Sequence, residues 1–228
     1  MIDLKRSVHR RGFLGSIAAG AAAVGITSLI NPLRINAGLK VQPPGPDLSE
    51  FDAWLGKIKG AHKQVFDAPA TNGGFPLVWS RVFLMTNKMV GAADNDVTAV
   101  VVLRHEAIPL AMESRLWEKY KLGENFKVTD GATKAPAIRN PFFHPKEGEM
   151  MLPGMAIEDL QGSGVLIGVC DMALTVYSKH LGELMKLDAC EIKKDWVSGL
   201  IPGIQIVPSG VLAINRAQEH GCTYCYAG

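Results

Sequence analysis

A cysteine that ends an apolar run is the first residue of this sequence whose position suggests chemistry. The stretch from Gly164 to Gly182, GVLIGVCDMALTVYSKHLG, begins as a strand-like apolar run and takes helical spacing after Cys170. The unpaired N–H groups and the dipole at a helix start favour an anion, and a thiolate is an anion. Asp171 opposes this effect, because it places a negative charge beside the sulfur. Cys170 is therefore a candidate nucleophile, and the alternative is an inert thiol that ends a strand.

A histidine follows a second apolar, β-branched run. His105 and Glu106 come just after residues 97–103, VTAVVVL, which are typical of a strand buried on both faces. Because parallel strands end at one edge of a sheet, we expect His105 near Cys170, where it could move a proton or stabilise the thiolate. Glu106 could act as a base or a ligand. The alternatives are a histidine packed against its loop and an exposed acid at a helix start.

The C-terminal cysteines Cys222 and Cys225 form a C-x-x-C pair, which is typical of redox sites and of half a metal site. Three interpretations stay open: a disulfide, as in oxidising compartments; a redox or persulfide partner for Cys170; and a metal site completed by His220. Zinc takes four ligands, so the pair alone is a weak metal signal. We assign no cofactor and keep a metal ion at these cysteines as the alternative. Cys190 is predicted to be a core thiol or a disulfide partner.

A turn of small residues, Val207-Pro208-Ser209-Gly210-Val211, precedes the last expected helix. Ser209 has the residue type and place of a helix N-cap. The N–H groups around Ser209 and Gly210 are also candidates for holding an anionic sulfur species.

Strand and helix patterns alternate along most of the chain, which indicates βαβ units and a parallel sheet covered on both faces. Ligands in such sheets bind outside the carboxyl ends of the strands, which is where Cys170 and His105 are expected. A helix with apolar Phe51, Trp54 and Leu55 precedes this part. The predicted strands are residues 77–85, 97–103, 165–169, 204–207 and 223–226, and the predicted helices are 106–120, 156–161, 171–181, one around 192–200, and 211–219.

The first 37 residues predict an export signal. A basic head precedes an Ala/Gly-rich apolar run from Phe13 to Ile30. The pair Arg10-Arg11, followed by Gly-Phe-Leu, resembles the twin-arginine signal of bacteria. We therefore expect a periplasmic protein that uses the twin-arginine translocase. The alternative is a membrane anchor formed by an uncleaved signal.

The remaining residues exclude nucleic-acid binding on charge grounds. The first 37 residues hold five of the 24 Lys and Arg and one of the 22 Asp and Glu, which leaves 19 basic and 21 acidic residues. No run of basic residues interleaved with aromatics remains. We divide the chain into a signal at 1–37, a linker with an N-terminal helix at 38–74, and an α/β domain at 75–228.

Three stretches taken together resemble the DsrE/DsrF-like family of sulfur-handling domains. They are VVVLRHEAIPLAM, DLQGSGVLIGVCDMALTVYSKHLG and LIPGIQIVPSGVLAINRAQEHGCTYCYAG. The matching features are His105-Glu106-Ala107 after a strand, Cys170 at a helix start, and the turn from Val207 to Val211. The resemblance extends over roughly Leu77 to Tyr226.

The resemblance implies a flavodoxin-like three-layer α/β sandwich with a mainly parallel five-stranded sheet, assembled as a homo-oligomer, a trimer or hexamer. It also implies that Cys170 carries a persulfide between a sulfur donor and an acceptor protein, like a sulfurtransferase, with His105 assisting. The chain departs from the cytoplasmic relay proteins in its export signal and its extra C-x-x-C. The alternative function is therefore a non-catalytic periplasmic protein that binds a metal or ligand through the C-x-x-C.

Overall fold

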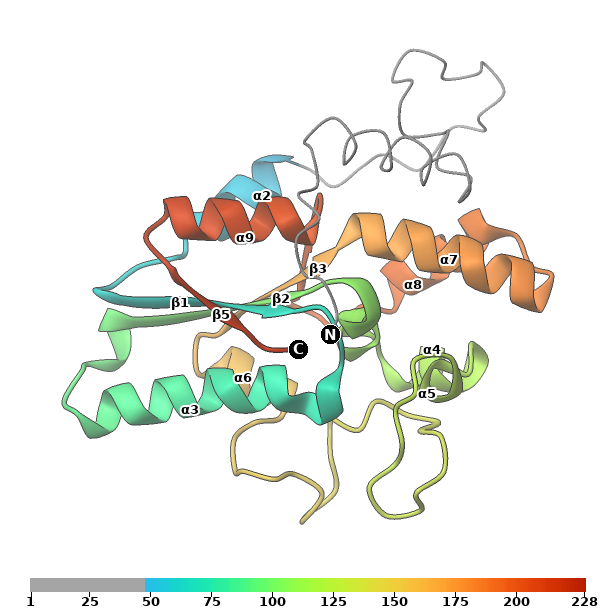
Figure 1. The fold of residues 1–228 in the computed structure, drawn as a ribbon, viewed down its shortest axis with the longest axis horizontal. Coiled ribbons are helices and arrows are strands. Elements are labelled where there is room, and N and C mark those ends of the chain that lie inside the picture. Colours follow the sequence, from blue (N-terminus) through green and yellow to red (C-terminus); the bar gives the residue numbers. More distant parts are fainter. Residues whose placement is uncertain (1–47) are drawn as a thin grey trace, which may run out of the picture. The chain divides into compact units, whose positions relative to one another are not determined.

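Five parallel strands form one sheet in the computed structural model, which describes residues 48–228 (Figure 1). Their order is β4-β3-β2-β1-β5. This order differs from the 2-1-3-4-5 order of flavodoxin itself, while the layers and the parallel direction are the same. The strands are β1 His62–Ala68, β2 Val97–Leu103, β3 Leu166–Cys170, β4 Gln205–Val207 and β5 Thr223–Tyr226.

Helices cover both faces of this sheet, which confirms the predicted three-layer α/β fold (Figure 1). Along each strand, alternate side chains enter one of two cores. Val65, Val100 and Val102 pack with α2 and α9, whereas Phe66 and Val101 pack on the side of α3. The α-helices are α2 Leu48–Leu55, α3 Phe75–Met89, α4 Ser114–Lys119, α5 Leu122–Asn125, α6 Ile157–Gly162, α7 Asp171–Met185, α8 Ala189–Ser198 and α9 Gly210–Glu219, and the 3₁₀ segments are η2 Asn72–Gly74, η3 Asp94–Asp96 and η4 His105–Ala111.

The connections after β3 and β4 lead to opposite faces of the sheet. After β3 the chain enters α7, whose buried residues belong to the core on the α3 side. After β4 it enters α9, which packs in the other core. The two strands are neighbours, with Cys170 opposite Val207. Adjacent strands whose connections diverge in this way form the crevice where open α/β sheets bind ligands.

Two expectations about the first half of the domain were wrong. Residues 77–85 form the middle of helix α3 and not a strand, since Leu77 and Val78 are buried on one side and Pro76 stands in the first turn. A short apolar run fits either element, and length decides between them. The expected domain boundary before Phe75 was also wrong, because β1 lies inside the sheet between β2 and β5. Its first residues, His62 to Gln64, are polar and partly exposed, which hid the strand pattern.

The other expected elements are present with small shifts of their ends. The N-terminal helix is α2, which buries Phe51, Trp54 and Leu55 as predicted. The helix expected at 106–120 is divided into the 3₁₀ segment η4, which contains Pro109, and the short helix α4. Proline removes a backbone donor and interrupts a helix interior, which explains the division.

The predicted signal at residues 1–37 lies outside the described residues. From residue 48 to residue 228, no helix has the length and apolar character needed to span a bilayer.

Candidate functional site

Cys170 ends strand β3 and serves as the N-cap of helix α7. Its Sγ accepts a hydrogen bond from the Ala173 N–H at 3.3 Å. The residue is 6% exposed, so most of it is buried while part of it still reaches solvent. The sequence predicted this handover from strand to helix, and the structure adds the amide donor. The N–H group aimed at the sulfur is a donor that an anionic sulfur species at this position can use.

The negative charge of Asp171 is paired, which removes the objection raised by its position. Its Oδ1 lies 2.7 Å from the Nζ of Lys193 in α8, and both side chains are largely buried. Lys193 also donates to Thr175 Oγ1 at 2.9 Å, so its position is fixed from two sides. A paired carboxylate repels a neighbouring thiolate less than a bare one does.

Arg104 belongs to the same edge of the sheet, and the sequence analysis missed it. Leu103, the last residue of β2, is in register with Val169 of β3, so Arg104 directly follows one strand while Cys170 ends its neighbour. Arg104 donates through Nε at 2.6 Å and Nη2 at 3.0 Å to the two carboxylate oxygens of Asp67. The signal was an arginine placed directly between a buried apolar strand and His105.

Asp67 is a nearly buried carboxylate at the end of β1, with a side chain 5% exposed. It accepts a third hydrogen bond from the Oη of Tyr224 in β5, at 2.9 Å. The hydrogen bond to Asp67 raises the pKa of Arg104 against the effect of burial, and the charges of Asp67, Tyr224 and Cys170 add to it. Burial raises the pKa of Tyr224, and the bond to Asp67 raises it further. Arg104 is thus held charged beside the cysteine.

The turn before α9 lies against Arg104, at the same edge of the sheet. Ser209 is the N-cap of α9, as predicted, and its Oγ accepts from the Leu212 N–H at 3.1 Å. Gly210 lies against Arg104: a Cβ added at Gly210 would stand 2.6 Å from the Cβ of Arg104. Any larger residue at 210 would displace this arginine. The predicted residue Gly210 therefore borders Arg104, and Ser209 comes two residues after Val207, the partner of Cys170 in the sheet.

His105 is exposed and adopts a left-handed backbone conformation, with φ of 50°. Such conformations are uncommon outside glycine and concentrate at functional sites. Its ring stands edge-on to Tyr177 of α7, with centroids 5.6 Å apart, and both ring nitrogens lie 3.4 Å from the tyrosine Oη. Burial raises the pKa of Tyr177, and the charge of the exposed Glu106 adds to it. Among the described residues His105 thus hydrogen-bonds Tyr177 and not Cys170, so its assisting role stays a prediction.

The C-terminal cysteines do not form a disulfide with each other, and their role as a redox or persulfide partner for Cys170 stays a prediction. Cys222 packs in the core with α2 and α9, whereas Cys225 packs against the opposite core. Both are free thiols. Burial raises the pKa of Cys222 to about 11, although Lys63 opposes this, and burial also raises the pKa of Cys225. Residues three apart on a strand face opposite sides, and that is the physical reason.

The metal alternative at His220, Cys222 and Cys225 finds no support in the geometry. Within residues 48–228, no three histidine, cysteine or acidic side chains stand close enough to hold an ion together. Cys190 is exposed at the start of α8 and free, so its expected place in the core or in a disulfide was wrong.

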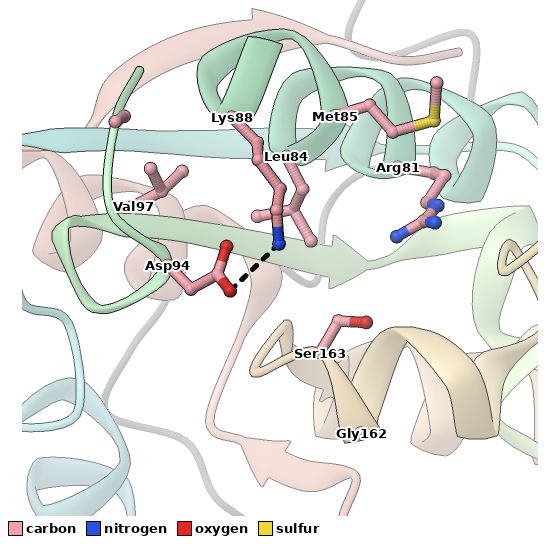
Figure 2. A pocket seen from close by; sticks show the side chains of 9 residues that line it. Arg81, Leu84, Met85, Lys88, Asp94, Val97, Gly162 and Ser163 are labelled. Carbon is pink, nitrogen blue, oxygen red and sulfur yellow. Dashed lines mark hydrogen bonds and ion pairs between the residues drawn. The ribbon is translucent and has the colours of Figure 1, made fainter.

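A cavity of about 560 Å³ opens at the other end of the sheet (Figure 2). It lies where β2 begins at Val97, between α3 and the turn after α6. Arg81 and Lys88 face it, but Arg81 donates to the Pro153 carbonyl at 3.2 Å and Lys88 pairs with Asp94 at 3.1 Å. Open parallel sheets bind their ligands at the carboxyl ends of the strands. We therefore place the candidate site at Cys170 and Arg104 and not in this cavity.

Comparisons with known proteins add little to this site. No family model and no curated protein matches the chain. A solved structure of a protein of unknown function, MTH1491 from Methanobacterium thermoautotrophicum, is similar at 16% identity and a TM-score of 0.39, covering 73% of this chain and 99% of that one.

Proposed function

We propose that this chain is a DsrE-like sulfur carrier in which Cys170 accepts a sulfane sulfur as a persulfide. The observation that carries the proposal is the placement of the Cys170 sulfur. It receives the Ala173 N–H and ends β3, the strand next to β2, which Arg104 directly follows. A thiolate at such a place is both stabilised and oriented for attack.

The proposed reaction has two balanced steps. The Cys170 thiolate attacks the sulfane sulfur of a donor, the donor's S–S bond breaks, and the departing sulfur group keeps the electron pair. The terminal sulfur of the resulting persulfide is then attacked by a thiolate of an acceptor protein, and Cys170 leaves as a thiolate. No oxidant or reductant is consumed, because sulfane sulfur moves between thiolates at constant oxidation level.

Lys193 supports this chemistry by neutralising Asp171, which otherwise places a full charge beside the sulfur. His105 and Tyr177 lie at the rim, where the imidazole is available to move a proton for a donor or acceptor group. The sulfur donor and the acceptor protein are the partners that this function requires.

Three further parts of the proposal rest on the sequence resemblance. They are export through the twin-arginine translocase on the strength of Arg10 and Arg11, a periplasmic location, and assembly into a homo-oligomer. Cell fractionation with an Arg10→Lys, Arg11→Lys variant tests the export. Light scattering on the purified protein tests the assembly, and a mass equal to one chain would contradict it.

Mass spectrometry tests the proposed function directly. Reduced protein is incubated with thiosulfate or polysulfide, blocked with iodoacetamide and digested. We expect one added sulfur on the Cys170 peptide and none there in Cys170→Ser. An unmodified Cys170 that alkylates freely would contradict the proposal. An added sulfur confined to Cys190 or Cys225 would contradict it as well.

A further inference from the structure

The structure assigns Arg104 to the anionic group of the sulfur donor, so that the donor is an anionic sulfane compound of the thiosulfate class. This inference rests on the proposed function of Cys170 and names the substrate class of the same site. It follows from the groups that hold Arg104 in place, from the N–H donors of Arg104 that stay unused, and from the position of Arg104 relative to Cys170.

Arg104 is fixed in direction by groups from three other elements. Asp67 of β1 binds it through two hydrogen bonds, and Tyr224 of β5 in turn donates to Asp67. On the other side Gly210 of α9 lies against its aliphatic stem, with room for no Cβ. A guanidinium that is held before any ligand arrives loses little conformational entropy on binding one.

The guanidinium keeps donors that its own chain does not use. A guanidinium carries five N–H donors. Within residues 48–228 the side-chain bonds of Arg104 go to Asp67 alone, through Nε and Nη2. Its side chain is 29% exposed, against 5% for Asp67, so the unused N–H groups have access from solvent. Charged donors of this kind bind planar or tetrahedral oxyanions.

The residue that carries the unused donors follows the strand next to that of the proposed nucleophile, and the charge of Cys170 is among the causes that raise the pKa of Arg104. Arg104 and Cys170 follow the in-register pair Leu103 and Val169, and neighbouring strands lie about 5 Å apart. In the proposed complex, a donor whose anionic group binds Arg104 presents an adjacent sulfur atom to the Cys170 sulfur. Thiosulfate has this layout, with a sulfane sulfur bonded directly to a sulfonate group.

The positive charge at Arg104 also fits the reaction. The Cys170 thiolate attacks the outer sulfur of thiosulfate, the S–S bond breaks, and sulfite leaves with the electron pair. The products are the Cys170 persulfide anion and sulfite, with the same total charge as the reactants. Negative charge grows on the leaving sulfonate during this step, and a fixed guanidinium stabilises it.

Two alkylating reagents of similar shape test the inference without sulfur chemistry. Iodoacetate is anionic and iodoacetamide is neutral, and mass spectrometry gives the rate of each at Cys170. We expect Arg104→Gln to lower the ratio of the iodoacetate rate to the iodoacetamide rate about tenfold, the loss of one charge-assisted hydrogen bond. Arg104→Lys should keep part of the ratio, and it also covers the case in which Arg104→Gln does not fold. The matched control is Arg115→Gln, which removes an arginine from another aspartate and should leave the ratio unchanged.

Thiosulfate itself provides the second measurement. Persulfide formation on Cys170 should become saturable in thiosulfate with the wild-type protein, and Arg104→Gln should weaken the apparent affinity at least tenfold. An unchanged alkylation ratio in Arg104→Gln and in Arg104→Lys would overturn the role of Arg104. If wild-type protein forms no persulfide with any donor, the proposed function fails, and the alkylation ratio still decides whether Arg104 recruits anions to Cys170.

Discussion

Arg104 and Arg115 are each held by an aspartate, but the groups around the two arginines differ. Each donates to an aspartate on another element, Arg104 to Asp67 and Arg115 to Asp195. Each also lies directly over a glycine. Arg104, however, follows the strand next to the one that ends at Cys170, and its side-chain bonds within the described part of the chain go to one partner. The comparison teaches that an ion pair does not by itself identify a site, and that the proposal for Arg104 rests on its unused donors and its place in the sheet next to Cys170.

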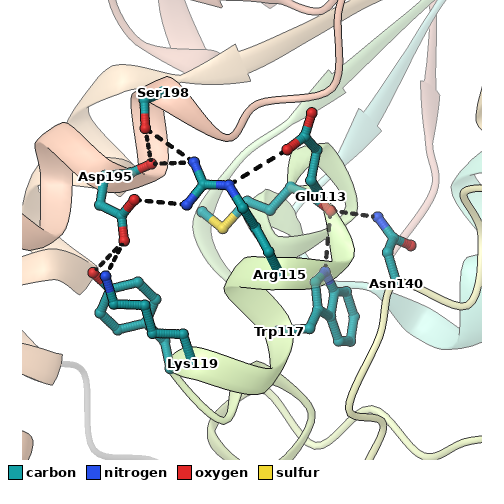
Figure 3. Close-up of polar contacts among 9 residues, drawn as sticks. Glu113, Arg115, Trp117, Lys119, Asn140, Asp195 and Ser198 are labelled. Carbon is teal, nitrogen blue, oxygen red and sulfur yellow. Dashed lines mark hydrogen bonds and ion pairs between the residues drawn. The ribbon is translucent and has the colours of Figure 1, made fainter.

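The surroundings of Arg115 are saturated (Figure 3). Its guanidinium donates to Asp195 at 2.7 Å and to Ser198 Oγ at 3.0 Å. Asp195 accepts further hydrogen bonds from Lys119 at 2.6 Å and Tyr120 at 2.7 Å. These bonds join α4 to α8. Because α8 carries Lys193, the cluster supports the site from a distance and takes no part in its chemistry.

A large effect on stability is expected at Asp195. Asp195→Ala removes the acceptor of three charged or phenolic donors, and we expect a loss of about 2 kcal/mol, since hydrogen bonds to charged groups contribute about 1.5–3 kcal/mol and this cluster is partly exposed. Urea unfolding measures the loss. The alkylation rate of Cys170 in the folded variant should stay within a factor of about two of wild type, as expected for a change far from the thiol. A large change in that rate would erase the distinction between the two arginines.

The hydrogen bonds to Asp195 should also make the stability of the protein depend on pH in the acid range. Burial opposes ionisation of Asp195, but hydrogen bonds from Arg115, Lys119 and Tyr120 hold its pKa well below the ordinary 3.8. The group therefore contributes stability above its unfolded pKa and loses this contribution as the pH falls below about 4. Between about pH 6 and pH 3 the wild type should lose more stability than Asp195→Asn. Equal losses would show that Asp195 gains nothing from its partners.

The two glycines give a matched pair of substitutions. A Cβ at Gly210 would lie 2.6 Å from the Cβ of Arg104, whereas a Cβ at Gly199 would meet the end of the Arg115 side chain at 2.5 Å. A guanidinium can move aside and a Cβ cannot. We expect Gly210→Ala to cost about 1–3 kcal/mol and to lower the iodoacetate preference at Cys170, and Gly199→Ala to cost less than about 1 kcal/mol. The opposite ranking would remove Gly210 from the site.

Substitution of Lys193 should have a smaller effect, seen in the reactivity of the Cys170 thiol. Lys193→Met leaves Asp171 unpaired next to Cys170, and we expect the iodoacetamide rate at Cys170 near neutral pH to fall about threefold to tenfold, as for the loss of a close charge pair. Lys193→Arg should restore the rate, because it keeps the charge. A loss in both variants would show that packing and not charge is responsible.

The smallest effect on stability is expected at His105. Asparagine tolerates a positive φ better than most residues, so His105→Asn should change stability by less than about 1 kcal/mol. Sulfur transfer from the Cys170 persulfide to a small thiol should slow about tenfold if the imidazole moves a proton. An unchanged transfer rate across the pH range would leave His105 as a residue that only packs against Tyr177.

The predictable part of the site was the part encoded by neighbouring residues. The runs before His105 and Cys170 are apolar and β-branched, so both strand ends and the helix start at Cys170 follow from local pattern. Asp67 was not predictable, because its strand has a polar first half and its partner Arg104 is 37 residues away. Lys193 pairs with Asp171 only through the packing of α8 on α7.

For the C-x-x-C, the strand that the sequence predicted was already an argument against a pair of cysteines. The sequence predicted a strand at residues 223–226, and the structure has the same strand. Cysteines three apart at such a strand face opposite sides of the sheet. The motif therefore suggested a pair that the predicted strand did not allow.

Alkylation of each cysteine in the folded protein tests the central claim most directly. Native protein is treated with a pulse of iodoacetamide near neutral pH, quenched, unfolded and mapped by mass spectrometry. Cys170 and Cys222 are equally exposed, at 6% each, but burial raises the pKa of Cys222 to about 11. We expect Cys170 to react before unfolding, together with the exposed Cys190, while Cys222 reacts only after unfolding. A Cys170 that stays protected with Cys222 until the protein unfolds would contradict the account.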